Sequence, residues 1–345
     1  MRKKIIIRCI TDESKGFGNF TRSYTLAKSL QKLGHKIIFI INNNKTIIDK
    51  LQKKKFRYFI IPKKFTYFTE WNFIDNVMNS VNSQLIVIDM REYAESISKK
   101  LLDKNYKVIL IDDAFCKKAY ADIIFNGTLS KQFHNYEIVN KKTKLYLGPK
   151  YFMANEEFEK SKKSLKNICK KKKYHILISM GGSDPTNLTL VVLKSLINLS
   201  DIQITVIIGP FFKNTRKITE LCNKNNVKLK FAPDKIWKEF EKADVVISKS
   251  GVTLYELVLL KIPTICIIAF KHEAKNAQFF MKKDCILNLG MYNRLKQDQI
   301  PKALKQLLDN PKKRKQLCLR SGKVIDGKGL NRTSQIISKI YDNYK

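Results

Sequence analysis

The sequence predicts an α/β protein made of two doubly wound, Rossmann-like domains that face a cleft. Short apolar runs alternate with amphipathic stretches along the whole chain, as they do when helices cover both faces of a parallel sheet. The chain has 345 residues, 44% of them apolar, which is more than one compact core usually accommodates. The alternation also begins again in the second half, after a stretch dominated by lysine.

Strands are expected where a short apolar run is followed by helical periodicity. In the first half these runs are 4–10, 36–41, 85–89, 107–112 and 122–125. In the second half they are 175–180, 204–209, 245–248 and 264–269, again with helices between them. The lysine-rich stretch lacks a sustained apolar face and is predicted to be a linker. We therefore expect an N-terminal Rossmann-like domain over 1–158, a linker over 159–173, a C-terminal Rossmann-like domain over 174–330 and a C-terminal helix over 331–345.

Lysine and arginine number 67 against 30 acidic residues, and this formal charge of +37 excludes an acidic surface. The charge is spread along the chain, whereas nucleic-acid binding needs a concentrated basic face, so nucleic acid is not the expected partner. Peripheral contact with an anionic membrane stays open. The seven cysteines form no Cys-x-x-Cys pair, which favours a reduced cytoplasm over a zinc site or a disulfide framework. A secretory signal and an apolar run long enough to span a membrane are both missing, so we expect a cytoplasmic protein.

Ligands of open α/β sheets bind beyond the carboxyl ends of the strands, so the turns that leave each strand are candidate sites. The first turn holds Gly16 and Gly18, and the helix that begins near Asn19 offers free N–H groups to an oxyanion. A plain tight turn is the alternative. Asp89 and Asp112 end two further strands at the same edge, where they can bind sugar hydroxyls or shift each other's pKa, or cap helices instead.

Two glycine-containing turns follow strands of the second half. The first contains Gly181, Gly182, Ser183 and Asp184. Asp184 can cap the next helix, but capping does not require paired glycines.

The turn after strand 245–248 has the most specific chemistry. Ser250, Gly251 and Thr253 place hydroxyls and backbone amides at a helix start, where they can hold a diphosphate. Glu256, one turn into that helix, can accept hydrogen bonds from two vicinal ribose hydroxyls, with compensation of the helix dipole as the alternative.

The last of these turns follows strand 264–269. It carries His272 and Glu273 side by side, with Asn276 at the start of the next helix. No other histidine of the chain is expected at a strand end that faces the cleft.

Together these turns resemble the UDP-sugar hydrolases of pseudaminic acid biosynthesis and the related spore-coat polysaccharide biosynthesis proteins. The resemblance covers nearly the whole chain and is most specific at Gly16 to Arg22, Asp112-Asp113 with Asn126, 147–151, 180–185, 250–256 and 326–329. It implies a two-domain glycosyltransferase-B architecture that holds UDP mainly in the C-terminal domain and the sugar or acceptor in the N-terminal domain.

One position departs from the family's pattern. Where these hydrolases have a histidine proposed to activate the attacking water, this sequence has Asn19. Asparagine can orient a water but cannot take its proton near neutral pH, and loss of a general base typically costs about 10²–10⁴ in rate. The catalytic candidates are therefore Asn19, Asp89 and, as a substitute base from the other domain, His272.

The expected activity is cleavage of the anomeric C–O bond of a UDP-activated acetamido sugar with release of UDP, in surface polysaccharide or nonulosonic acid biosynthesis. Transfer of the sugar to a lipid or glycan hydroxyl is one alternative. A UDP-sugar binding protein without catalysis is the other. No cofactor or metal is expected beyond the UDP-sugar substrate.

Overall fold

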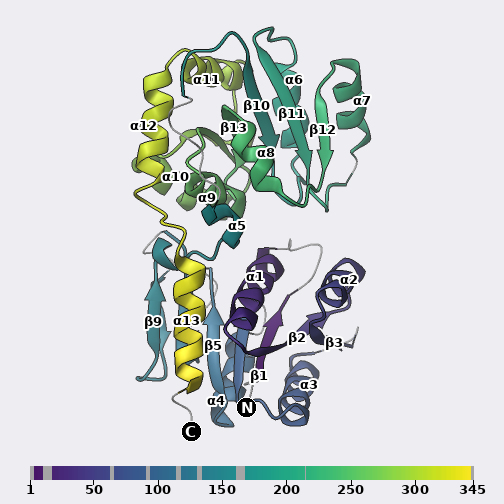
Figure 1. Ribbon diagram of the computed structural model, residues 1–345, viewed down its shortest axis with the longest axis vertical. Coiled ribbons are helices and arrows are strands. Elements are labelled where there is room, and N and C mark those ends of the chain that lie inside the picture. Colours follow the sequence, from purple (N-terminus) through teal and green to yellow (C-terminus); the bar gives the residue numbers. More distant parts are fainter. Residues whose placement is uncertain are drawn as a thin grey trace. The chain divides into compact units, whose positions relative to one another are not determined.

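The computed structural model describes residues 4–10, 18–62, 66–90, 94–113, 118–129, 134–160, 168–213 and 215–342. The chain divides into two compact units, Met1–Asn155 with Gly327–Lys345 and Glu156–Asp326 (Figure 1). Each unit is a parallel sheet covered by helices, so the predicted fold class of two doubly wound α/β domains is confirmed.

The sheet of the first unit has the strand order β3-β2-β1-β4-β5-β7-β9 in the described residues, with every pair parallel. Its strands are β1 (Lys4–Cys9), β2 (Lys36–Asn42), β3 (Arg57–Ile61), β4 (Leu85–Asp89), β5 (Lys107–Ile111), β7 (Ile123–Asn126) and β9 (Lys144–Leu147). Its helices are α1 (Gly18–Lys32), α2 (Lys45–Lys53), α3 (Tyr67–Ser80), α4 (Ala94–Asp103), the 3₁₀ turn η3 (Pro149–Tyr151) and α13 (Gly329–Asp342). The short strands β6 (Lys118–Ala119) and β8 (Glu137–Ile138) pair separately.

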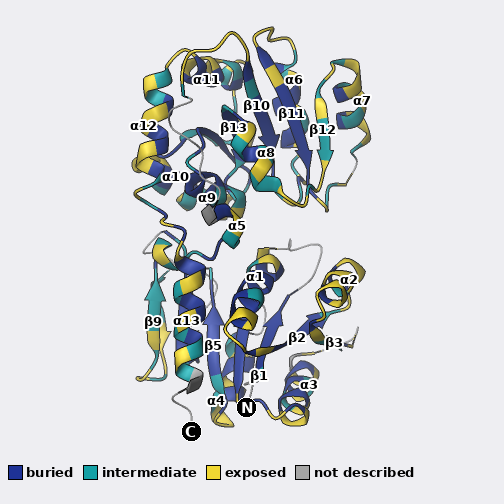
Figure 2. Cartoon of the chain, viewed as in Figure 1, coloured by how far each residue is buried: buried dark blue, intermediate teal, exposed yellow. Residues whose placement is uncertain are grey.

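Alternate side chains of β1 reach two separate cores, which explains the continuous apolar run in its sequence. Ile5 and Ile7 pack in a cluster with residues of α1, α2 and α13. Ile6 packs in a second cluster with residues of α3 and α4. Figure 2 shows the buried strands between exposed helix faces. Local signals fix helix starts as well, since Asn44 caps α2 and a Thr66–Thr69 capping box starts α3.

The sheet of the second unit has the order β12-β11-β10-β13-β14-β15 in the described residues and is also parallel. Its strands are β10 (Tyr174–Ser179), β11 (Ile202–Ile208), β12 (Lys228–Phe231), β13 (Val245–Lys249), β14 (Thr264–Ile268) and β15 (Leu287–Met291). Its helices are α5 (Glu156–Lys160), α6 (Leu188–Leu196), α7 (Arg216–Lys224), α8 (Ile236–Lys242), α9 (Val252–Leu259), α10 (Ala274–Lys282), α11 (Gln299–Leu308) and α12 (Pro311–Ser321), with 3₁₀ turns η5 (Lys271–Glu273) and η6 (Tyr292–Arg294).

The chain returns to the first unit at its C-terminal end, so the units divide at 155 and 326, where the sequence suggested 158 and 330. Two glycines permit this return. A Cβ at Gly329 would lie 2.2 Å from the carbonyl oxygen of Phe152, and one at Gly127 would lie 2.7 Å from Phe152 Cα. Helix α13 is then held against α1 by a 2.9 Å hydrogen bond between Ser29 and Ser334. Helix α5 (Glu156–Lys160) begins before the stretch expected to be linker and ends inside it, and residues 161–167 of that stretch lie outside the described residues.

No helix among the described residues combines the length and the apolar character that crossing a membrane requires.

Candidate functional site

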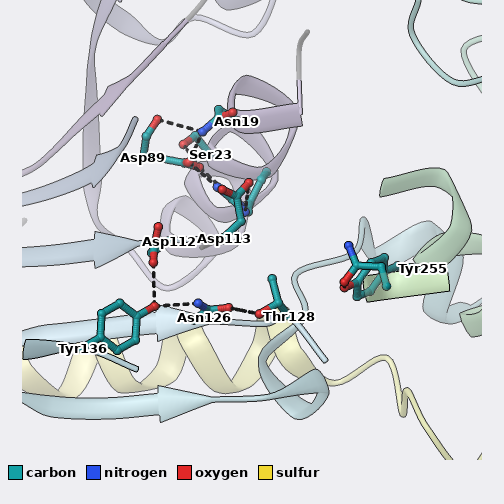
Figure 3. Close-up of polar contacts among 11 residues, drawn as sticks. Asn19, Ser23, Asp89, Asp112, Asp113, Asn126, Thr128, Tyr136 and Tyr255 are labelled. Carbon is teal, nitrogen blue, oxygen red and sulfur yellow. Dashed lines mark hydrogen bonds and ion pairs between the residues drawn. The ribbon is translucent and has the colours of Figure 1, made fainter. Parts of the chain in front are cut away.

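Asp89, the last residue of β4, is fully buried at the carboxyl edge of the first sheet and binds three side chains of α1 (Figure 3). Arg22 forms a bidentate ion pair with Asp89, in which Nη2 donates to Oδ1 at 2.5 Å and Nε donates to Oδ2 at 3.0 Å. Asn19 Nδ2 donates to Oδ1 at 2.8 Å and Ser23 Oγ donates to Oδ2 at 2.9 Å. Because both carboxylate oxygens are occupied by charge-assisted and neutral donors, Asp89 has the geometry of a positioning group for α1.

Asn19 lies buried in the first turn of α1, which begins at Gly18 close to the expected position. Its amide nitrogen is directed to Asp89, and no described residue bonds to its amide oxygen. That oxygen is therefore the atom with which Asn19 can accept a hydrogen bond from a ligand. Nearby, burial and then the Asp89 charge raise the pKa of Cys9 to about 12, so Cys9 remains a thiol. Gly16 lies outside the described residues.

A second polar network follows β5 and β7 in the same unit (Figure 3). The Tyr136 hydroxyl donates to Asp112 Oδ2 at 2.7 Å and accepts from Asn126 Nδ2 at 2.6 Å. Asn126 Oδ1 accepts from the Thr128 amide and hydroxyl at 3.0 and 2.6 Å. Asp113 Oδ2 lies 3.7 Å from Arg22 Nη1, which connects the two networks. The structure thus brings together Asp112, Asn126 and the Asp89 group through Tyr136 and Arg22.

In the second unit, the turns after β10 and β11 pack backbone against backbone. Gly181 has φ +77°, a conformation that side chains other than glycine rarely adopt. A Cβ at Gly209 would lie 2.3 Å from the Gly181 carbonyl oxygen, and the Phe211 amide donates to the Gly182 carbonyl at 2.9 Å. The position of the paired glycines is therefore set by contact with the neighbouring strand end.

Asp184 satisfies its carboxylate within its own turn. It accepts hydrogen bonds from the amides of Leu188 and Thr189 at 3.0 and 2.7 Å and from Thr186 Oγ1 at 3.1 Å. These contacts fit the capping alternative, and a role of Asp184 in ligand binding stays a prediction.

The start of α9 collects groups that suit an anion. Lys249, the last residue of β13, donates from Nζ to the Ser183 carbonyl at 3.1 Å. A Cβ at Gly181 would lie 3.5 Å from both Lys249 Cε and Thr253 Oγ1, so the glycine turn, the lysine and the threonine hydroxyl lie together. Gly251 is the N-cap residue of α9, and because it has no side chain, no side-chain cap hydrogen bond is made to the first amides of the helix. A cation, a hydroxyl and unpaired helix amides at one point favour a phosphate.

Glu256 lies half-buried in α9, and no described residue forms a hydrogen bond or an ion pair with its carboxylate. Burial raises its pKa from 4.5 to about 7. A carboxylate that is desolvated and lacks a donor can gain a hydrogen bond from a ligand hydroxyl without breaking one in the protein.

The three predicted residues in and after the turn that follows β14, His272, Glu273 and Asn276, have different surroundings. His272 is exposed and stacks on Phe270, with ring centroids 5.6 Å apart. Glu273 is buried, its Oε2 has no partner in the described residues, and burial raises its pKa. Its backbone carbonyl accepts from Ser250 Oγ at 2.8 Å, which fastens this turn to the start of α9. Asn276 Oδ1 accepts from the Tyr255 hydroxyl at 2.8 Å.

Sequence analysis missed Ser23, Tyr136 and Lys249. Lys249 directly follows the predicted strand 245–248, so the rule that directed attention to strand ends could have found it. Ser23 and Tyr136 lie beyond the turns. Their roles depend on hydrogen bonds to Asp89 and Asp112, which are 66 and 24 residues away along the chain. Among the described residues, no group of three or more His, Cys, Asp or Glu is arranged to hold a metal ion.

The chain is similar to several known proteins. Residues 155–325 match the glycosyltransferase family 28 C-terminal domain. The chain is 22% identical over 336 residues to the spore coat polysaccharide biosynthesis protein SpsG of Bacillus subtilis, covering 95% of this chain and 96% of that protein. It is 25% identical over 285 residues to the UDP-2,4-diacetamido-2,4,6-trideoxy-beta-L-altropyranose hydrolase of Campylobacter jejuni, covering 81% and 97%.

An uncharacterized protein of Methanocaldococcus jannaschii, MJ1062, is 28% identical over 289 residues, and the match spans 80% of this chain but 58% of that protein. The crystal structure of Acinetobacter baumannii MurG superposes with a TM-score of 0.71 at 12% identity, covering 97% of this chain and 99% of MurG. The resemblance inferred from the motifs is confirmed, and the fold is of the glycosyltransferase-B type.

Proposed function

We propose that this homologue of the spore coat polysaccharide protein and of the altropyranose hydrolase cleaves the anomeric C–O bond of a UDP-activated acetamido sugar and releases UDP. The homology supports an enzyme that acts on UDP-sugars in polysaccharide biosynthesis. Hydrolysis and a substrate with acetamido groups are the finer steps of the proposal, and they are supported by the relative whose name states that reaction.

The observation that carries the proposal is the start of α9 in the second unit. Lys249, Thr253 and the amides after Gly251 lie together there, and we assign them to the two phosphates of UDP. Glu256 lies about one helical turn after the first residue of α9, and we assign it to the ribose attached to the diphosphate. One compact element therefore offers contacts to both parts of a nucleoside diphosphate.

The chemistry assigns different tasks to the two units. In the second unit, the α9 amides and Lys249 stabilise the charge that UDP gains when the C1–O bond breaks and the electron pair leaves with the phosphate oxygen. In the first unit, Asn19 accepts a hydrogen bond from the attacking water, and Asp89 holds Asn19 in place. The new bond joins the water oxygen to C1, and the proton that water loses passes to solvent or to a base.

Transfer to an acceptor hydroxyl is the second candidate, and the contacts of Asp89 favour it. Arg22, Ser23 and Asn19 occupy both oxygens of this carboxylate, so the described part of the Asn19 network presents no free base for water. An alcohol acceptor that is positioned by binding needs less help from a strong base when C1–O cleavage leads the reaction.

The decisive experiment incubates the protein with a panel of UDP-activated acetamido sugars, without and with glycan or lipid acceptors, and quantifies UDP and free sugar. UDP and free sugar in equal amounts without acceptor are expected. UDP release only with an acceptor would replace hydrolysis by transfer. UDP binding without turnover of any substrate would indicate a binding protein without catalysis. Absence of UDP binding would refute the proposed UDP site.

A further inference from the structure

Helix α12 has two faces of opposite character. Arg314, Leu317, Cys318 and Ser321 are buried against the second unit. The outward face, here called the α12 face, is formed by the exposed residues that line one open groove, namely Lys312, Lys315, Gln316, Leu319, Arg320 and Lys323. Their spacing of three and four residues puts them on one side of α12 and of the turn that follows it, which holds Lys323. Figure 2 shows exposed positions along α12.

The α12 face carries positive charge that no acidic residue in the described part of the chain neutralises. None of its four cations forms an ion pair with an acidic residue in the described part of the chain. Helix α12 itself contains no acidic residue between Pro311 and Ser321, whereas α2, α4, α7 and α8 each mix acidic residues with their lysines. Helices α1, α10 and α11 also lack acidic residues, but they carry three, two and two basic residues, whereas α12 carries five. The α12 face is therefore distinguished by the density of its unpaired cations.

Leu319 lies among these cations and is 49% exposed. A large apolar side chain inside a ring of lysine and arginine matches the chemistry of a bilayer surface, where headgroup phosphates meet cations and the acyl boundary receives the apolar group. A purely polar polyanion would satisfy the cations but would offer the leucine no apolar partner.

We propose that the α12 face docks the second unit on a membrane that contains anionic phospholipids. Lys312, Lys315, Arg320 and Lys323 contact the headgroups, and Leu319 enters the interface between them. The surface lies on the opposite side of helix α12 from its packed residues and includes none of the residues assigned to the UDP-sugar site, so docking and catalysis are separable.

The test measures sedimentation of the full chain with phosphatidylcholine vesicles, with and without phosphatidylglycerol. Binding to the anionic vesicles alone, weakened by salt, is expected. Each cation near an anionic surface contributes about fivefold to partitioning, so Lys312→Gln, Lys315→Gln and Lys323→Gln together should weaken it on the order of 100-fold. Leu319→Gln should weaken binding several-fold in a way that salt changes little. All four positions are exposed, so the variants should fold.

A matched control removes the same charge from α7 and the loop before it, with Lys213→Gln, Lys217→Gln and Lys224→Gln, all of which are exposed. This variant should retain vesicle binding within a few-fold. Equal loss in the two triple variants would show that net charge alone drives binding and would overturn the proposal. Absence of binding to anionic vesicles at low salt, or binding of duplex DNA in their place, would also overturn it. UDP affinity should be the same in all these variants, which separates this test from that of the proposed function.

Discussion

Replacement of Gly251 by alanine tests the phosphate site directly. The protein has room for the added methyl group, but the methyl group would occupy space that a bound phosphate needs. Gly251 has φ −88°, which alanine adopts freely. Its added Cβ would lie 3.5 Å from Glu273 Oε1 and 3.7 Å from Lys249 Cε, which are ordinary contacts. The methyl group would, however, stand at the N-cap of α9, beside the amides that the diphosphate needs.

The two effects differ in size. A glycine-to-alanine change at a compatible backbone position alters the free energy of unfolding by no more than about 1 kcal/mol. A charge-assisted hydrogen bond contributes about 1.5–3 kcal/mol, so the loss of one phosphate contact should weaken UDP binding about 10- to 100-fold. Gly251→Ala should therefore separate stability from affinity.

Isothermal titration calorimetry with UDP measures the affinity, and thermal unfolding measures the stability. The control is Gly322→Ala in the same unit. The three atoms nearest its Cβ all belong to the flexible end of Lys261, and this variant should bind UDP unchanged. Full UDP affinity in a folded Gly251→Ala protein would refute the placement of the diphosphate at α9.

Three further predictions address the catalytic position, the half-buried acid and the glycine contact. Asn19→His puts a base beside Asp89, so acceptor-free UDP release should increase about 10²-fold or more, and no increase in a variant that still binds UDP would exclude this base. Because burial raises the Glu256 pKa from 4.5 to about 7, the folded protein retains a proton that the unfolded chain releases, and the free energy of unfolding should fall as pH rises through this range. Glu256→Gln should flatten that part of the profile in urea unfolding at several pH values, and an unchanged slope would assign it to another group. Gly209→Ala places a Cβ 2.3 Å from the Gly181 carbonyl oxygen and should cost about 3 kcal/mol or more, which a thermal melt close to that of the unchanged protein would contradict.

Within the two large sheets, the strands that sequence analysis missed share a position in the fold. β3, β9, β12 and β15 are the edges of the two sheets. An edge strand is covered less completely than a central one, so Lys228–Phe231 needs no continuous apolar run and resembles a loop in sequence. The central strands β1, β4, β10 and β13 are buried on both faces, and their uninterrupted apolar runs identified them.

The sequence by itself determined the α/β class, the central strands and the turns at their carboxyl ends, because hydrophobic periodicity and glycine placement act over a few residues and are written locally. Only the tertiary structure decided that Asp89 is occupied by α1 and that the C-terminal helix belongs to the first unit. Both depend on contacts between residues that are far apart in the sequence and meet only in the folded chain. An aspartate at a strand end is the same residue in the sequence whether its carboxylate oxygens are free or hydrogen-bonded.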